Sequence, residues 1–222
     1  MKDYYLTFDT ETANTLNDPL IYDIGGAIHD RYGNVEETFS FIIDEVFNGM
    51  SDLMETSYFA HKIPQYREQI ESGARKVVKF VYAKCYIKEL CEKYQVKACI
   101  AHNARFDYRS TVTTQRYLTK SRYRFFLPYG VELWDTLKMA RQVLPLMPRY
   151  NDFCFEHGFL TKRGAPQLTA EVIYRWITRD ATFEESHTGL EDVLIEKEIF
   201  AYIVRMGIIT KIVKNVWEKV RA

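Results

Sequence analysis

The sequence predicts an α/β fold, in which a mixed β-sheet is flanked by helices. Three β-prone runs separated by short turns come first, and the rest of the chain alternates short apolar runs with segments of helical periodicity. Strands followed by strand–helix alternation are typical of a mixed sheet with helices packed on its faces. Because no repeat, low-complexity tract or glycine- and serine-rich linker interrupts residues 1–222, we expect a single domain.

The N-terminal strands are expected at Tyr4–Phe8, Leu20–His29 and Thr38–Ile43. These runs are rich in aromatic and β-branched residues, and the turn signal Tyr-Gly-Asn at 32–34 separates the last two. Three consecutive strands with short connections favour an antiparallel meander.

Helical periodicity begins over Ala74–Tyr94, where valine, tyrosine, cysteine and leucine recur on one face with lysine and glutamate between them. The short apolar run Ala98–Ala101 predicts a strand, and a helix is expected to begin after Asn103. The remaining helices are expected over Asp135–Leu144, Leu168–Trp176 and Thr188–Met206.

The charge balance limits the classes of function. The chain carries 30 basic and 30 acidic residues, unlike the strongly basic proteins that coat nucleic acid through phosphate contacts alone. It is compatible with a nuclease, whose acidic metal site offsets basic residues elsewhere. The four cysteines lack C-x-x-C spacing, and no apolar run is long enough to span a bilayer, so we expect a soluble, cytoplasmic protein without a membrane partner.

The first candidate site residues are Asp9 and Glu11, at the end of the first predicted strand. Side chains two residues apart point to the same face of a strand, so this pair can hold one cation together. Carboxylate oxygens are the ligands that hard divalent cations prefer. At this composition a D-x-E pair is expected about once by chance, so the pair alone indicates little.

A second motif is more specific. The run His-Asn-Ala-Arg-Phe-Asp at 102–107 follows a short predicted strand and opens a helix, which places Asp107 in the first helical turn. A third motif contains His187 and Asp192 near the start of the last predicted helix. Composition alone gives a histidine and an aspartate at this spacing about one time in four, so this pair is informative only together with the other two motifs.

Taken in order, Phe-Asp-Thr-Glu-Thr at 8–12, the run at 102–107 and His-Thr-Gly-Leu-Glu-Asp at 187–192 resemble the three motifs of the DEDDh family of 3′→5′ exonucleases. This family includes the proofreading epsilon subunit of DNA polymerase III, RNase T and oligoribonuclease. The resemblance runs from Tyr5 to about Ile203 and includes an Asp-Thr-Leu segment at 135–137. It implies an RNase H-like α/β fold with a central mixed five-stranded sheet flanked by helices.

The resemblance also implies that Asp9, Glu11, Asp107 and Asp192 ligate two Mg²⁺ or Mn²⁺ ions around the scissile phosphate. In the two-metal scheme one ion lowers the pKa of a water molecule and aims it, while the other stabilises the leaving 3′ oxygen. His187 would take the proton from this water as general base, because imidazole titrates near neutral pH.

The five-residue spacing gives His187 a role separate from that of Asp192, since on one regular helix the two side chains would point about 140° apart. We therefore expect His187 in the loop or frayed turn before the last helix. The helix could instead begin earlier, because Thr-Phe-Glu-Glu at 182–185 resembles a capping box. The sibling subtype, with a catalytic tyrosine four residues before its last aspartate, is excluded because that position is Thr188.

Substrate contacts are expected from the motifs and from one further segment. Within the motifs we assign to substrate binding Thr10, Thr12, His102, Asn103 and Phe106. The segment 112–130, longer than the family's usual connection, contains Lys120, Arg122 and Arg124 among aromatic residues, which favours a flap that grips phosphates and stacks on bases. The alternative is a solvated loop anchored to the core by its aromatic residues. Gly189 also departs from the family, which usually has alanine there.

Three functions are compatible with these residues. The leading one is a DNA exonuclease that acts on a single-stranded or frayed 3′ end and releases nucleoside monophosphates, as a stand-alone trimming enzyme or as a proofreading subunit with a polymerase or replication partner. The nearest rival is an RNase T-like or oligoribonuclease-like exoribonuclease, which uses the same carboxylates. A non-catalytic binding or assembly module on the same fold predicts damage to at least one of the five site residues, and all five are intact.

Overall fold

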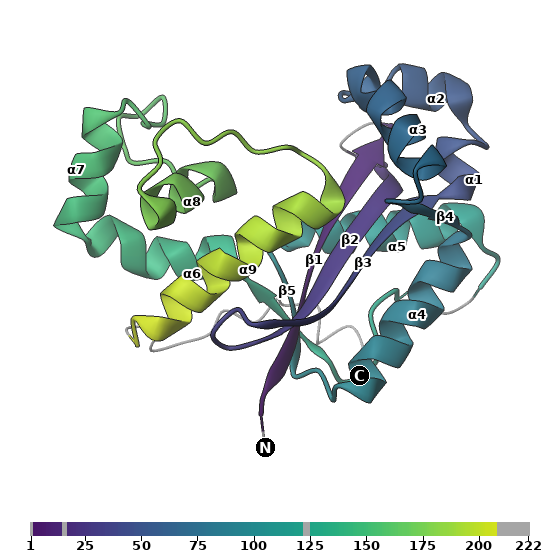
Figure 1. Cartoon of the computed structure of the whole chain (residues 1–222), viewed down its shortest axis with the longest axis horizontal. Coiled ribbons are helices and arrows are strands. Elements are labelled where there is room, and N and C mark those ends of the chain that lie inside the picture. The colour runs from purple at the N-terminus through teal and green to yellow at the C-terminus, as the bar shows by residue number, and fades with distance from the viewer. Residues whose placement is uncertain (1, 15–16, 122–124, 208–222) are drawn as a thin grey trace.

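The computed structural model describes residues 2–14, 17–121 and 125–207 (Figure 1). It confirms the α/β prediction, because helices cover both faces of a mixed sheet, although the sheet has six strands where five are expected. The strands are β1 Tyr4–Ala13, β2 Leu20–Asp30, β3 Val35–Ile43, β4 Lys76–Val78, β5 Ala98–Ala101 and β6 Glu132–Asp135.

The strand order in the sheet is β4-β3-β2-β1-β5-β6. β1, β2 and β3 form the expected antiparallel meander. β4 pairs in parallel with β3, β5 with β1, and β6 with β5. Because β1 and β5 are parallel neighbours, the first motif, in the second half of β1, lies beside the turn after β5 that begins the second motif.

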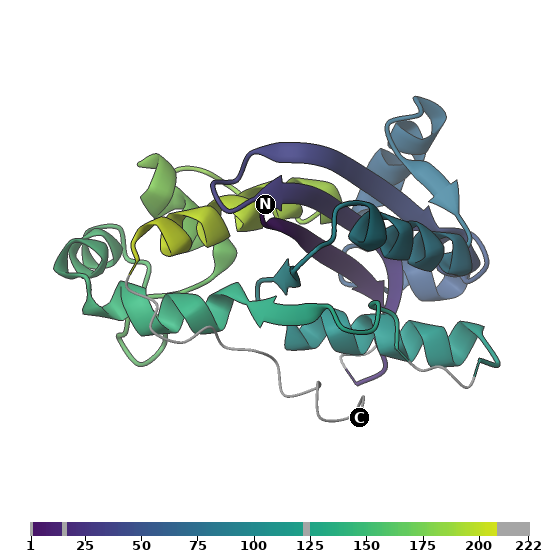
Figure 2. The same ribbon diagram turned by 90° about the horizontal axis from the view of Figure 1, so that it is seen from below.

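The helices lie on both faces of the sheet, with α4 and α5 on one face and α6, α8 and α9 on the other (Figures 1 and 2). Among the described residues, no helix combines the length and the apolar character needed to cross a bilayer. The α-helices are α1 Asp44–Phe47, α2 Ser51–Glu55, α3 Ile63–Glu71, α4 Phe80–Lys93, α5 Arg105–Leu118, α6 Thr136–Val143, α7 Pro148–Glu156, α8 Ala170–Thr178 and α9 Gly189–Arg205, and the 3₁₀ helices are η1 Ala60–Lys62 and η2 Leu144–Leu146.

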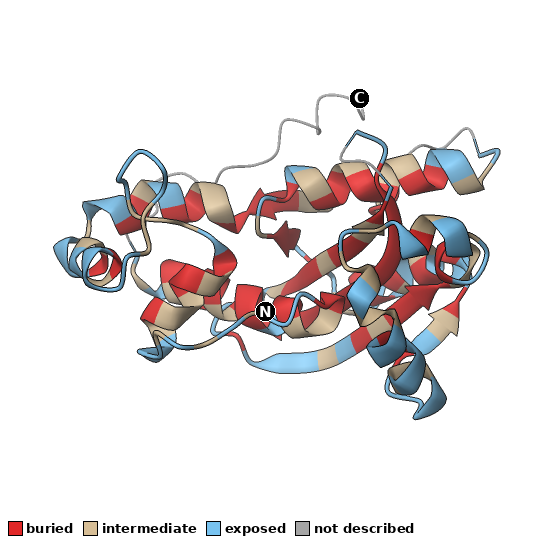
Figure 3. Ribbon diagram, turned by 90° about the horizontal axis from the view of Figure 1, so that it is seen from above, coloured by how far each residue is buried: buried red, intermediate tan, exposed pale blue. Residues whose placement is uncertain are grey.

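Successive side chains of a strand point to opposite faces of the sheet, and the interior is therefore divided into two cores. Leu6 and Phe8 of β1 join the core under α4 and α5. Tyr5 faces the opposite side, where its ring centroid lies 5.4 Å from that of Trp134 and 4.8 Å from that of Phe200 on α9. β1, β2, β5 and the inner sides of the helices are largely buried, whereas the first part of β3 is exposed (Figure 3). The sheet therefore holds α5 and α9 in fixed places on either side of β1.

The helix expected over Ala74–Tyr94 is wrong at its start, because residues 76–78 form β4 and α4 begins only at Phe80. The valines at 77 and 78 continue the amphipathic pattern of the helix, but pairing with Phe41–Ile43 of β3 draws them into a parallel strand. The sequence pattern also does not predict β6, α7 or the short helices α1 to α3. β6, α1 and α2 have four or five residues and are too short to show a period. α3 and α7 have nine residues each but bury only Tyr66 and the pair Tyr150 and Cys154, so their apolar pattern is weak.

The segment 112–130 is partly integrated into the core. Residues 112–118 belong to α5. Phe126 and Leu127 are buried, and the Phe126 ring centroid lies 5.3 Å from that of Phe80 on α4. This packing agrees with the anchored-loop alternative. Arg122 and Arg124 lie outside the described residues.

Candidate active site

The three sequence motifs meet in one cavity of about 830 Å³. β1, the β5–α5 turn, α5 and the start of α9 form its floor, while α6 and residues 160–170 form its outer wall. The predicted site residues that line this cavity are Asp9, Thr10, Glu11, His102, Asn103, Phe106, Asp107, His187 and Asp192.

Three carboxylates face one another at the floor of the cavity. Asp9, Glu11 and Asp192 each offer an oxygen, and these three oxygens lie within 4.8 Å of one another. Asp9 and Glu11 come from alternate positions of β1, and Asp192 comes from the first turn of α9. This spacing suits a divalent cation, whose oxygen ligands lie roughly 2.0–2.6 Å from it.

Asp107 is held beside this group by Thr10. It lies in the first turn of α5 and is 2% exposed. Its Oδ1 accepts hydrogen bonds from the Thr10 backbone N–H at 3.2 Å and from the Thr10 hydroxyl at 2.8 Å. The sequence motifs assign Thr10 to substrate binding, but its hydroxyl instead orients the carboxylate of Asp107. Thr12 is not among the residues that line the cavity.

Burial and mutual repulsion favour the protonated forms of these carboxyl groups. Burial, followed by the charge of Asp192, raises the pKa of Glu11 to about 9. Burial, followed by the charge of Glu185, raises the pKa of Asp192 to about 8. Burial raises the pKa of Asp107 to about 7, and burial together with the Asp107 charge raises the pKa of Asp9. Carboxyl groups shifted together in this way mark a place where a cation would be strongly attracted.

Asp192 gives a second indication of a bound cation. The residue is 5% exposed, and its Oδ1 atom is buried without a hydrogen-bond partner in the described part of the chain. A buried oxygen without a partner is costly, and coordination to a cation would satisfy it. The cavity lining includes no cysteine among the described residues, and the oxygens of Asp9, Glu11 and Asp192 suit a hard divalent cation such as Mg²⁺ or Mn²⁺.

Two further glutamates line the cavity, and sequence reasoning missed both. Glu196 lies one helical turn after Asp192, is 4% exposed, and accepts a hydrogen bond from the backbone N–H of His102 at 3.1 Å. Glu185 lies in the loop before α9, with an oxygen 3.8 Å from Nδ1 of His187. The four-residue spacing from Asp192 is the signal that could have indicated Glu196, because such residues share a helix face.

His187 lies in the loop before α9, as the spacing of the third motif predicts. α9 begins at Gly189, so the capping-box pattern at 182–185 does not start the helix. His187 has a left-handed backbone with φ 49°, and its side chain is 47% exposed. One ring nitrogen lies within 4.8 Å of an oxygen of Asp192. An imidazole in this position can exchange protons with solvent beside the carboxylates.

His102 ties the second motif to the outer wall. Its ring nitrogens lie 3.0 Å from the Thr136 hydroxyl and 2.9 Å from the Leu168 carbonyl oxygen. The ring therefore connects the end of β5 with α6 and with the segment before α8, and it positions the turn. Asn103, with φ 65°, is exposed and Phe106 is half-buried, so both stay available as substrate-binding predictions.

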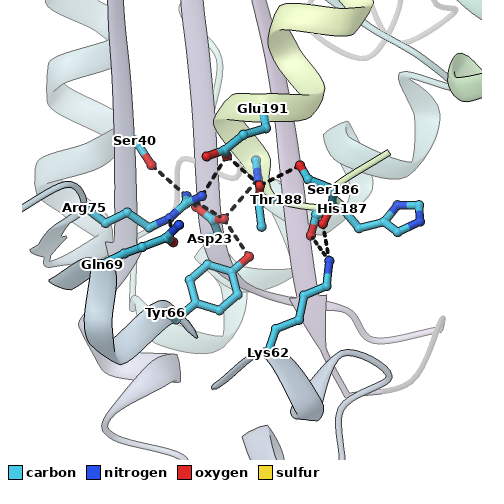
Figure 4. A network of polar contacts seen from close by, with 11 residues as sticks. Asp23, Ser40, Lys62, Tyr66, Gln69, Arg75, Ser186, His187, Thr188 and Glu191 are labelled. Carbon is cyan, nitrogen blue, oxygen red and sulfur yellow. Dashed lines mark hydrogen bonds and ion pairs between the residues drawn. The ribbon is translucent and has the colours of Figure 1, made fainter. Parts of the chain in front are cut away.

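A buried charge network fixes the start of α9 to the sheet (Figure 4). Asp23 of β2 is fully buried and accepts hydrogen bonds from the Gly189 N–H and from Arg75, both at 3.0 Å. Arg75 also pairs with Glu191 at 2.7 Å. A Cβ atom on Gly189 would lie 2.7 Å from the backbone nitrogen of Gly25. This close approach of helix and strand explains glycine where the resemblance leads us to expect alanine.

The exposed cations at the outer wall come from residues that sequence reasoning did not single out. Arg141 of α6 and Lys162 of the loop between α7 and α8 both line the cavity. Lys120, by contrast, follows the far end of α5, and the helix from Asp107 to Leu118 rises about 16 Å. The structure therefore does not bring Lys120 to the cavity.

No protein-family model matches the sequence, and no curated protein matches it. Among solved structures, exonuclease I of Methylocaldum szegediense superposes with a TM-score of 0.56 at 18% identity, covering 92% of this chain and 40% of that chain. A product-bound exonuclease I gives 0.56 at 18% identity, covering 93% and 44%. E. coli exonuclease I in complex with an oligonucleotide gives 0.57 at 15% identity, covering 94% and 41%.

This chain spans less than half the length of these exonucleases. The likeness at such low identity concerns the course of the backbone. The chain therefore has the RNase H-like α/β fold that exonuclease I also has.

Proposed function

We propose that this protein is a metal-dependent 3′→5′ exonuclease of the DEDDh type, working as one domain that releases nucleoside monophosphates from a DNA end. The observation that carries the proposal is the meeting of three ordered motifs in one cavity. There Asp9, Glu11 and Asp192 lie within 4.8 Å of one another, and His187 lies at the rim. A structural accident would not be expected to gather these residue types from β1, α5 and α9.

The proposed cofactor is a pair of Mg²⁺ or Mn²⁺ ions held by Asp9, Glu11, Asp107 and Asp192. Such ions would supply Lewis acidity toward the phosphodiester and would acidify a water molecule. The raised pKa values of the carboxyl groups and the unpartnered oxygen of Asp192 support this assignment.

The chain's own side chains would orient the site and move the proton. Thr10 holds Asp107 in place through two hydrogen bonds to its Oδ1. His187 would act as general base for the attacking water, and its exposed ring would pass the proton on to solvent. Glu196 holds the backbone of the second motif through the His102 N–H.

A nucleic-acid strand is the proposed substrate, and DNA is favoured. Arg141 and Lys162 offer exposed cations for phosphates at the outer wall, while Phe106 offers a ring beside the carboxylates. Among structures of the same fold, E. coli exonuclease I is in complex with a dT13 oligonucleotide. A proofreading subunit would receive frayed ends from a polymerase partner, and a stand-alone enzyme would take free ends.

One assay tests this proposal. Single-stranded DNA, duplex DNA and RNA, each labelled at the 5′ end, are incubated with the protein and Mg²⁺, Mn²⁺ or a chelator. We expect a ladder of shortening labelled strands from single-stranded DNA with either metal and none with the chelator. Asp192→Asn protein, purified in parallel, controls for contaminating nucleases. Equal cleavage by that variant would refute the proposal, a labelled mononucleotide as first product would reverse the polarity, and faster cleavage of RNA would select the exoribonuclease.

A further inference from the structure

We propose that Lys62 and Phe59 form a clamp that positions His187 for its role in the reaction. The inference rests on the proposed function, and it assigns a task to the segment around η1, which no sequence motif includes. Lys62 is the last residue of η1, and Phe59 comes directly before that helix. Neither residue lines the cavity, and both contact His187.

Lys62 holds two consecutive carbonyl groups of the loop before α9. Its Nζ donates a hydrogen bond to the Ser186 carbonyl oxygen and another to the His187 carbonyl oxygen, the latter at 3.0 Å. Figure 4 shows the lysine reaching from its own helix to these two oxygens, with the imidazole directed away from the Asp23 network. One ammonium group thereby fixes the peptide units on both sides of the His187 Cα.

Phe59 holds the side chain of the same residue. Its ring is nearly parallel to the His187 imidazole, with centroids 5.2 Å apart and planes 25° apart. The Lys62 Nζ lies 4.7 Å from the centroid of the Phe59 ring, within the range of a cation–π contact. The lysine and the phenylalanine therefore support each other as well as the histidine.

The backbone of His187 needs such support. Its φ of 49° is a left-handed conformation that costs free energy for a residue other than glycine. Ser186 and His187 are exposed and lie outside any helix or strand. On the other side, Thr188 is tied to the body of the protein, because its hydroxyl donates to Glu191, the partner of Arg75. The segment 186–188 is thus held at Thr188 by Glu191 and at Ser186 and His187 by the clamp.

The test compares Lys62→Met with Lys62→Arg, which keeps donors for both carbonyl groups. Lys93→Met is the control, because the Lys93 Nζ also lies 4.7 Å from the centroid of an aromatic ring, that of Tyr94, but on α4, where it pairs with Glu37. We expect Lys62→Met and Phe59→Ala to lower kcat by about tenfold with KM within about twofold of wild type. Lys62→Arg and Phe59→Tyr should recover most of the loss, and Lys93→Met should change neither constant.

Two further measurements separate the clamp from other roles. In a His187→Ala background, Lys62→Met should cause no further loss of kcat, because the lysine acts through the histidine. Backbone order parameters of residues 186–188 from NMR relaxation should be lower in Lys62→Met and Phe59→Ala than in Lys93→Met, whether or not the protein cleaves DNA.

Several outcomes would overturn the clamp. A raised KM with unchanged kcat in Lys62→Met would make the lysine a substrate contact. An undiminished effect of Lys62→Met in the His187→Ala background, or unchanged order parameters in residues 186–188, would show that the clamp does not position His187. Failure of the nuclease proposal would appear instead as an inactive wild-type protein, and the order parameters would still decide the clamp.

Discussion

The floor and the outer wall of the cavity are built in different ways. The motif carboxylates of the floor come from a strand and from the first turns of two helices, and Glu11, Asp107 and Asp192 are buried. The outer wall presents the exposed cations Arg141 and Lys162, the latter on a loop. The sheet and the helices packed on it therefore fix the carboxylates to which the proposed function assigns the chemistry, whereas the proposed substrate contacts could vary without disturbing them.

The largest effect is expected at the floor. Asp192→Asn should reduce turnover by at least about a thousandfold, because it removes a charge on which cation binding depends. The same change relieves repulsion among the carboxylates, so the free energy of unfolding of the metal-free protein should stay equal or rise. Single-turnover cleavage and urea denaturation in chelator measure the two parts. Near-normal rates in this variant would mean that the floor is not the active site.

His187 lies between the floor and the outer wall, and its loss should affect proton transfer rather than cation binding. His187→Ala should lower kcat by about 10²–10⁴-fold, the usual contribution of a general base. It should also remove the acidic limb of the pH–rate profile. Calorimetric titration with Mn²⁺ should show a much smaller loss of affinity than in Asp192→Asn. Equal losses in the two variants would make His187 a ligand.

Substitutions in the outer wall should weaken substrate binding more than they slow the chemical step. Replacing Arg141 and Lys162 together with alanine should raise KM by about tenfold and weaken its salt dependence by about 0.7 in log–log slope for each lost phosphate contact. The comparison variant carries alanine at Lys120, Arg122 and Arg124, the cations that the sequence favours. A larger change in KM for the triple variant than for the double one would indicate that the segment 112–130, and not the outer wall, binds the substrate.

The last effect concerns how the stability of the metal-free protein depends on pH. In the folded protein the pKa of Asp192 is about 8 against 3.8 ordinarily, and that of Glu11 is about 9 against 4.5. Between the ordinary and the raised values the folded state binds more protons than the unfolded state, so the free energy of unfolding should fall as the pH rises. Urea denaturation in chelator at about pH 5 and about pH 8 measures this fall, which saturating Mg²⁺ should reduce. A rise in metal-free stability over this interval would contradict the raised pKa values.

The sequence by itself determined the parts of the molecule that repeat or that follow a motif. Alternation along the first strand placed Asp9 and Glu11 on one face, and the five-residue spacing placed His187 outside the helix that carries Asp192. The strand Ala98–Ala101 and the helix after Asn103 appear where they are expected. These predictions succeed because local geometry alone decides which way neighbouring side chains point.

Tertiary structure decided everything that depends on contacts between distant segments. Residues 76–78 became a strand only because β3 offers an edge for pairing. Arg141 and Lys162 reached the cavity, and Lys62 reached His187, through packing that no local pattern encodes. Glycine is required at position 189 because an added Cβ atom would lie 2.7 Å from the backbone of β2. Such contacts depend on which surfaces the fold brings together, and spacing within one chain segment does not record them.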